Sequence, residues 1–471
     1  MMVKNSNRWI AAGMVSALML CSGCNTLKEC RTPELNLPEE IIDEGTDSAS
    51  LADIEWFEFY SDPHLRHILT ETLANNRNLQ AAVARINQLH ELYGAAKAEL
   101  LPEIGENFHI KNETKYERGH SFKRISEYGA LATLSWEADI WGNLRWRSKQ
   151  ELATYKASVE DMRALRIILI AEAASAYYRL VAYDNELTIV KRTLLTRNEE
   201  KAKAKLRFEG GLTSEIVYLQ AQVEYNTARS LIPGLERQIE VCESALLTLM
   251  GRYPGEKLER SRNAMDIELV SPERIPVGLP SSLLVRRPDL RASEARLSRS
   301  LTAVGVAYTN RFPRLTISME GGLEAVNPGS LFNSPNSFIN GALIGPIFDF
   351  NKRKRRYKAA VAEYDAARLN YEQNVLVAFQ EVNDAVIAYR KAREATAAKN
   401  ELMKATKRYV ELAHLQYRAG TISYIDVLDA QRRYLDAEIG LSNSMRDAML
   451  AMITLYKSLG GGWSDTLSQE S

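Results

Sequence analysis

The sequence contains few of the residues that usually carry catalysis or metal binding. Among its 471 residues are only six histidines and four cysteines, and their spacing matches no zinc motif such as His-Glu-x-x-His. Neither a glycine-rich phosphate loop nor the nucleophile elbow of a hydrolase is present. We therefore expect no enzyme activity, no catalytic residues, no cofactor and no metal site.

A net charge and a long apolar run are also lacking. The 60 basic and 60 acidic residues balance to a formal charge of +0, which gives no electrostatic reason to expect nucleic acid as a partner. Beyond the N-terminus, no apolar stretch is long enough for a transmembrane helix. Any membrane crossing must therefore be made by β-strands, whose backbone groups can pair with one another in lipid. The hydrophobic content of 45% still permits a large core.

The N-terminus has the pattern of an export signal. Two basic residues precede an apolar stretch that is too short to span a bilayer. The stretch ends in Leu-Cys-Ser-Gly-Cys24, which resembles a lipobox, so we predict a signal peptide over 1–23, lipid on Cys24 and an extended leader over 24–55. The alternative is ordinary signal cleavage without a lipid. Cys30 and Cys242 are interpreted as structural bystanders, and the sequence leaves open whether they form a disulfide.

A duplication organises the rest of the chain. A segment that begins near Leu79 recurs about 210 residues later, and the matches fall on residues that shape the backbone. The matching pairs are Leu79 with Leu290, Arg85 with Arg296, Gly94 with Gly305, and Pro102 with Pro313. A period this long exceeds the roughly 50 residues of a solenoid repeat. We predict two helix–hairpin–helix units, at 56–260 and 261–463, followed by a tail over 464–471.

In the middle of each unit, the hydrophobic period changes from that of a helix to that of a strand. Apolar and polar side chains alternate over residues 128–139 and again from Leu315. This pattern fits a strand between lipid and a water-filled lumen, and it fits the edge of a soluble sandwich equally well. The two hairpins are placed at about 103–140 and 314–349. Their partner strands are expected near 104–112 and 338–348, and their loops at 114–127 and 324–337.

Each unit also contains a very long stretch without glycine or proline. The stretches cover residues 143–209 and 347–419, and at 1.5 Å per residue each could form a helix of roughly 100 Å. Each ends at a glycine, after which Ser214 or Ser423 is a plausible N-cap for a return helix. The expected tips are 209–215 and 418–424, and the expected return helices are 215–250 and 424–458. Such helices must pack in coiled-coil-like pairs to bury their apolar stripes.

Four strands in one chain cannot close a barrel, and strands in lipid cannot leave their edges unpaired. If these strands lie in a membrane, several chains must contribute to one barrel. Three chains would supply 12 strands, which is within the range of known barrels. Their helices would then extend the cylinder away from the membrane.

Several motifs in the same order carry a family resemblance across nearly the whole mature chain. They are Trp56-Phe with Asp62-Pro63, Arg286-Arg-Pro-Asp-Leu-Arg291 with Glu294 and Gly305, Pro313, Tyr417-Arg-Ala-Gly420, Asp426-Val-Leu-Asp-Ala-Gln431, and Leu455-Tyr-Lys-Ser-Leu-Gly-Gly-Gly-Trp463. With them the chain resembles the TolC-like outer membrane factors, specifically their lipoprotein branch. The resemblance implies an α+β membrane protein. It would be a homotrimer, with a 12-stranded outer-membrane β-barrel continuous with a long periplasmic α-helical barrel.

The resemblance further implies a passive exit duct in the outer membrane of a Gram-negative bacterium. It would be lipid-anchored, extend into the periplasm, and conduct small molecules such as drugs. Its implied partners are a periplasmic adaptor and an inner-membrane transporter of the resistance–nodulation–division class, with outer membrane lipid around it. Alternatives are a duct for type I protein secretion or for metal-ion efflux. A non-pore adaptor or structural lipoprotein fits less well, because an adaptor predicts one hairpin with lipoyl-like segments.

The resemblance also implies a constriction at the tip of the second unit. The matching residues here are Ile425, Asp426, Asp429, Arg432 and Tyr417. The two aspartates are three residues apart and so share a helix face; by threefold symmetry they would form carboxylate rings that attract cations. Arg432 is then the nearest candidate to offset the repulsion between them. The alternative is that both are ordinary acids at a helix start, favoured by the helix dipole.

Two features depart from the family pattern at this tip. Some members have an arginine two residues after the tip glycine, where this chain has Ile422. The first unit has Val217 and Gln220 in place of the two aspartates. The sequence therefore predicts a gate at the second tip only, without saying which bonds hold it closed.

Overall fold

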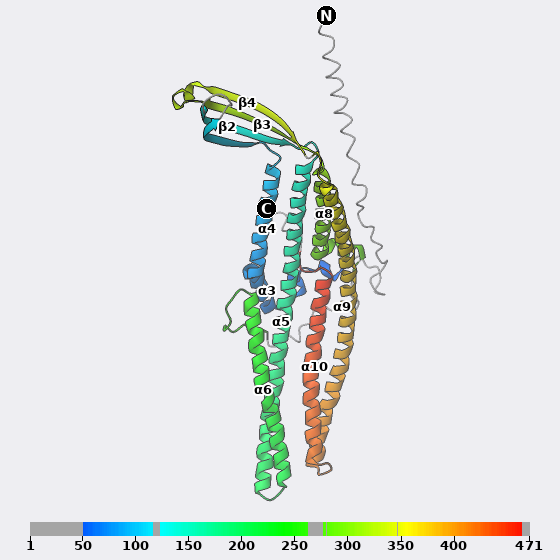
Figure 1. Ribbon diagram of the computed structural model, residues 1–471. Coiled ribbons are helices and arrows are strands. Elements are labelled where there is room, and N and C mark those ends of the chain that lie inside the picture. The colour runs from blue at the N-terminus through cyan, green and yellow to red at the C-terminus, as the bar shows by residue number, and fades with distance from the viewer. Residues whose placement is uncertain (1–49, 116–122, 262–276, 279, 346, 464–471) are drawn as a thin grey trace. The chain divides into compact units, whose positions relative to one another are not determined.

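The computed structural model describes residues 50–115, 123–261, 277–278, 280–345 and 347–463 (Figure 1). The predicted signal peptide, Cys24, Cys30, most of the leader and the tail lie outside the described residues. The chain divides into two compact units. Among the described residues, the sheet unit includes those within 85–159 and 292–373, and the helical unit includes those within 50–84, 160–291 and 374–463.

The sheet unit contains one antiparallel sheet with the strand order β1-β2-β3-β4 (Figure 1). The strands are β1 (Glu103–Lys115), β2 (Lys123–Ala138), β3 (Arg314–Ala325) and β4 (Pro335–Ile344). Both predicted hairpins therefore join one sheet, through pairing of β2 with β3. Within the described residues, the outer edges of β1 and β4 pair with no further strand.

The register places one apolar row, drawn from all four strands, on one face. Leu134 lies opposite both Ile104 and Met319, and Met319 lies opposite Ile339, so this row is continuous across the sheet. Leu131 and Phe338 lie on the other face, so the alternation is not strict in β2 and β4. Several of these side chains are exposed in the single chain, including Ile104 at 76% and Ile339 at 69%. An apolar face this open indicates contact with lipid or with another protein.

The first predicted hairpin loop is too long. Residues 114–127 were expected as a loop, but β1 continues to Lys115 and β2 begins at Lys123. The ladder pairs Thr114 with Arg124, so backbone pairing with a neighbouring strand overrides the polar composition of this segment.

The second hairpin and the helix after it also differ from expectation. A 3-10 helix, η5 (Pro328–Asn333), occupies much of the expected loop, and β4 begins and ends earlier than predicted. The following helix begins at Lys352 instead of residue 347. The residues before it, Phe350 and Asn351, have φ angles of 51° and 63°, a left-handed conformation that a right-handed helix cannot continue.

Apart from the later start of α9, the long helices match their predicted positions to within one residue. The helices are α2 (Trp56–Phe59), α3 (Pro63–Asn75), α4 (Arg77–Ala98), α5 (Asn143–Glu209), α6 (Glu215–Leu249), α7 (Pro280–Arg286), α8 (Pro288–Thr309), α9 (Lys352–Arg418) and α10 (Tyr424–Ser458), with a 3-10 turn η3 (Leu51–Asp53) before them. α5 and α9 each contain 67 residues, and α6 and α10 each contain 35. None of the helices in the described ranges is long and apolar enough to cross a membrane.

Two of the motif residues account for the packing where the strands meet the helices. A Cβ on Gly305 would lie 2.4 Å from the ring of Trp146, so only glycine allows α8 to approach α5 this closely. The carbonyl of Pro313 accepts a hydrogen bond of 2.8 Å from Trp141, whose ring stacks on Phe312.

Another motif residue, Asp62, is buried in the helical unit, where its carboxylate accepts several hydrogen bonds. Its carboxylate caps α3 by accepting a bond of 2.8 Å from the backbone N–H of His64. It also accepts bonds from the hydroxyl of Tyr177, at 2.5 Å, and from that of Ser261, at 3.1 Å. The segment that follows α6 is thereby fixed to α3 and α5.

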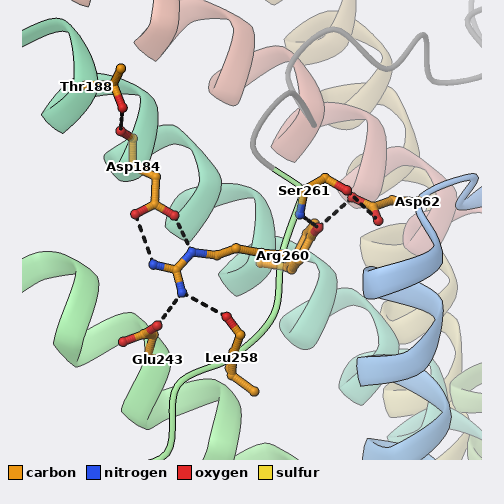
Figure 2. Close-up of polar contacts among 8 residues, drawn as sticks. Asp62, Asp184, Thr188, Glu243, Leu258, Arg260 and Ser261 are labelled. Atoms are coloured by element: carbon orange, nitrogen blue, oxygen red, sulfur yellow. Dashed lines mark hydrogen bonds and ion pairs between the residues drawn. The ribbon is translucent and has the colours of Figure 1, made fainter. Parts of the chain in front are cut away.

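The neighbouring Arg260 strengthens this attachment (Figure 2). Its guanidinium donates to Asp184 on α5, with one bond of 3.0 Å, and forms an ion pair with Glu243 on α6. One side chain thus joins the chain segment after α6 to both helices of the first hairpin.

The Arg-Arg-Pro-Asp motif lies at the junction of α7 and α8. Arg287 is buried and donates to Asp289 at 2.7 Å, to Glu381 on α9 at 2.6 Å, and to the carbonyl of Ser458 at 3.2 Å. Burial alone would lower the pKa of Arg287, but the bonds and charges of the two carboxylates outweigh it, and the pKa is raised. The motif is therefore a structural anchor between α8, α9 and the end of α10.

Candidate functional site

The predicted gate residues gather around the tip of the second helical hairpin. α9 ends at Arg418, Gly420 follows with a φ of +76°, and Ser423 is the N-cap of α10. One carboxylate oxygen of Asp426 accepts bonds from the backbone N–H of Ser423, at 2.9 Å, and from its hydroxyl, at 2.7 Å. These bonds lower the pKa of Asp426, and they close the turn as a capping box does.

Asp429 is paired, but not with the residue that the sequence suggested. Its carboxylate accepts a bond of 2.8 Å from Arg433, one helical turn further along α10. The prediction that Arg432 offsets its charge is wrong, because Arg432 donates instead to Glu224 on α6, at 2.7 Å. Arg432 and Arg433 are about 100° apart around the helix, so they face different neighbours.

Glu224 is the centre of a buried ion network that joins the two hairpins. Its side chain is 7% exposed, and it pairs with Arg197 on α5, whose side chain is 4% exposed, as well as with Arg432 on α10. A buried carboxylate is tolerated when charged partners satisfy it. The network therefore connects α5 and α6 of the first hairpin to α10 of the second.

A second set of polar contacts lies closer to the tips. Arg207 on α5 donates to the hydroxyl of Tyr417 on α9 at 3.2 Å. Gln431 on α10 donates to Glu200 on α5 at 2.7 Å, and its amide lies 3.1 Å from the ring nitrogen of His414. The two hairpins are therefore joined by side chains, not only by apolar packing.

A cavity of about 700 Å³ lies between the ends of the two hairpins. Its lining includes Lys203 and Arg207 from α5, Val217 from α6, Tyr417 from α9 and Tyr424 from α10. Ala413 on α9 and Val427 and Ala430 on α10 form a small buried apolar cluster at the second tip. Ile422 and Tyr424 pack against this cluster. Ile422, which departs from the family pattern expected at this tip, therefore makes an apolar contact.

The first tip lacks the bonds that close the second. Gly211 has a φ of +74°, like Gly420, but Ser214 makes no side-chain capping bond. Leu212 and Ile216 are exposed at 74% and 65%. The two hairpin tips thus share the same backbone turn, but they differ in the side-chain hydrogen bonds that stabilise it.

The structure brings some of the predicted residues together and separates others. Tyr417 contacts Tyr424 at the start of α10, with ring centroids 5.6 Å apart, whereas Ile425 projects outward and is 52% exposed. Sequence reasoning missed Arg197 and Glu224. The signal was present, because Glu224 lies in the buried stripe of α6 between Ala221 and Ala228, where an acid needs a buried partner.

Comparisons with known proteins agree with the observed fold. The model of the outer membrane efflux protein family matches residues 68–252 and 279–461, once for each duplicated unit. The chain is 28% identical over 467 residues to the probable efflux pump outer membrane protein TtgC of Pseudomonas putida, with 97% of this chain and 96% of that protein covered. It is 31% identical over 416 residues to the solvent efflux pump outer membrane protein SrpC of Pseudomonas putida, covering 86% and 87%.

A solved structure gives the same result. The open state of the MtrE outer membrane channel of Neisseria gonorrhoeae superposes with a TM-score of 0.83 at 26% identity, covering 92% of this chain and 97% of that one. The similarity therefore extends over both duplicated units and includes the strands as well as the long helices.

Proposed function

The chain belongs to the outer membrane efflux protein family, and from this membership we propose that it is the exit duct of a tripartite efflux pump. Two observations together carry the proposal. The chain has two repeats, each with a β-hairpin and a long helical hairpin, and it matches an outer membrane channel over 92% of its length. It is a passive duct, so the energy for transport comes from an inner-membrane transporter.

The assembly that fits this role is a homotrimer. Each chain offers a four-stranded sheet with an exposed apolar face, and no other strand of its described part pairs with the two outer edges. Three chains would pair these edges and give a closed 12-stranded barrel, which leaves no backbone group unsatisfied in lipid. The apolar face would contact lipid and the polar face would line the lumen.

The partners that fit the helical end are a periplasmic adaptor and a transporter of the resistance–nodulation–division class. The cavity between the hairpin tips, with its basic and apolar lining, offers a surface for an adaptor. The cargo that we propose is small molecules such as drugs and solvents, since one relative is named as part of a solvent efflux pump.

The purified protein should form ion-conducting channels in planar bilayers, and unboiled samples should run as a heat-sensitive trimer in gels. In cells, crosslinking from the cavity residue Lys203 should capture an adaptor. Monomeric protein that gives no conductance would contradict the pore and leave a periplasmic adaptor or structural lipoprotein as the better explanation.

The gate proposal concerns the aspartates at the second tip. Replacing Asp429 with alanine should raise single-channel conductance, and the concentration of divalent cation that blocks the channel should rise on the order of tenfold, because a ring of three acids no longer concentrates cations. Arg433→Ala should have the opposite effect on block, since it frees the carboxylate that Arg433 now pairs with. Both values come from single-channel recordings in planar bilayers.

The matched control for these variants is Asp447→Ala. Asp447 is also on α10, is exposed, and pairs with Arg446 at 2.8 Å, but it lies more than four helical turns from the tip. If the same concentration of divalent cation blocks wild type, Asp429→Ala and Arg433→Ala, then Asp429 does not lie at the constriction.

We also propose that the mature chain is anchored through a lipid on Cys24. The support is the lipobox-like sequence that ends at this residue. Cells grown with labelled palmitate should yield labelled protein, and Cys24→Ala should lose the label completely. Labelling that persists in the variant would show that the lipid, if any, is attached elsewhere.

A further inference from the structure

Three potential metal ligands meet on the polar face of the sheet. They are His109 on β1, Glu127 on β2 and Glu324 on β3, and one ligand atom from each lies within 4.8 Å of the others. The register explains the cluster, because Gly129 lies opposite both His109 and Glu324, and Glu127 is two residues before Gly129 on the same face. We propose that this cluster binds a divalent transition-metal ion such as Zn²⁺.

The distance between two of the three ligands suits such an ion. His109 Nε2 lies 3.6 Å from the nearer carboxylate oxygen of Glu127, close to the roughly 3.4 Å between two ligands of a tetrahedral ion with bonds of about 2.1 Å. One imidazole and two carboxylates are ligands that Zn²⁺ accepts, with a fourth position left for water. The side chains of His109 and Glu127 are 28% and 32% exposed, so a dissolved ion can reach them.

The surroundings hold the ligands in place. A Cβ on Gly129 would lie 2.2 Å from the imidazole of His109, so this glycine provides the space in which the ring lies. The Nδ1 atom of His109 is buried and has no hydrogen-bond partner among the described residues. No hydrogen bond at this atom therefore competes with metal binding by the imidazole. Glu324 is oriented by a short bond from Asn336 on β4.

The charges also favour a bound cation. Glu127 and Glu324 place two carboxylates close together, and like charges at this range repel unless a proton or a cation lies between them. The basic residue opposite Glu127 is Lys111, whose charge acts on Glu127 while its ammonium also lies 3.6 Å from Glu113, so one ammonium is shared among these carboxylates. All three ligands come from one chain, so the site does not rest on the proposed channel function.

The test is a calorimetric titration of the chelator-treated, purified full-length protein with Zn²⁺, where we expect one ion per chain. His109→Ala should weaken Zn²⁺ binding by at least about tenfold, since loss of a residue that only supports a ligand already costs that much. His90→Ala is the matched control: His90 lies 3.6 Å from Glu91 on α4, and no third ligand from the described chain joins that pair. Mg²⁺ should not compete, because imidazole selects transition metals.

A second variant separates geometry from ligand loss. Gly129→Ala keeps all three ligands but fills the space of the imidazole, so it should also weaken Zn²⁺ binding by about tenfold. Heat-sensitive trimer bands and conductance, measured on the same preparations, report folding and the channel function independently. Zn²⁺ binding that is unchanged in both His109→Ala and Gly129→Ala, or that Mg²⁺ displaces equally well, would overturn the proposal.

Discussion

Glu224→Ala should destabilise the protein by about 3–5 kcal/mol and raise the conductance of the channel, because it removes the shared partner of two cations. Arg197 is buried and would lose its ion-pair partner, leaving only the less direct charges of Glu200 and Asp436 to act on it. Arg432 would lose the bond that holds α10 against α6. The second tip would therefore be freer to move away from the first hairpin.

The two effects can be measured separately. Guanidinium unfolding followed by helix circular dichroism gives the free energy of unfolding, and planar-bilayer recordings give the conductance. The matched control is Glu236→Ala, which removes an ion pair with Lys191 that also joins α5 and α6 but is about half exposed. An exposed pair contributes less than about 1 kcal/mol. If both variants lose the same stability, burial of the Glu224 network has no energetic role.

A further variant tests whether the Glu224 network fixes the position of α10 against α6 or raises the free energy of unfolding. Replacing Arg197 and Glu224 together with apolar residues of similar volume should recover most of the lost stability, as for other buried ion pairs. It cannot restore the bond to Arg432. Conductance should therefore stay raised in the double variant, while the free energy of unfolding returns towards that of the wild type.

Arg287→Ala should have a comparably large effect, a loss of about 3–5 kcal/mol, because the side chain is a buried charge with several partners. Asp289 and Glu381 would both lose a cation, and the carbonyl of Ser458 at the end of α10 would lose its donor. Arg287→Lys should recover only part of this loss, since an ammonium cannot reproduce the planar fork of donors.

The measurement for Arg287 is the temperature at which the heat-sensitive trimer dissociates, together with the yield of trimer from membranes. Arg368→Ala is the control, because Arg368 pairs with Glu372 one turn along α9, and both side chains are 33% exposed. A dissociation temperature that falls equally in both variants would mean that Arg287 is an ordinary surface arginine.

Much of this fold could be predicted from sequence because its signals are long or repeated. The 67 residues of α5 contain no glycine or proline that would break a helix. The capping pattern at Ser423 fixed the start of α10. The ends of strands were less predictable, because Thr114 and Arg124 are paired only by virtue of a neighbouring strand.

The sequence predicted that the candidate gate residues lie at the second hairpin tip, but it did not predict the bonds they make there. The sequence shows that Asp429 has arginines three and four residues later, and a helix lets either one reach it. Which of them does so depends on Glu224, a residue about 200 positions away in sequence that attracts Arg432. The sequence did not reveal the cluster that we propose as a metal site for the same reason, since His109, Glu127 and Glu324 come together only through the register of three strands.

The equal lengths of the paired helices restrict how the two halves of the chain can diverge. α5 matches α9 residue for residue in length, and α6 matches α10. Deleting a single residue would turn every later side chain of that helix by about 100° and move its end by about 1.5 Å. Substitutions carry no such shift, so the copies have been free to differ in charge at their tips while keeping a common length. We therefore expect these helices to tolerate substitutions that change side-chain charge, but not insertions or deletions that change helix length.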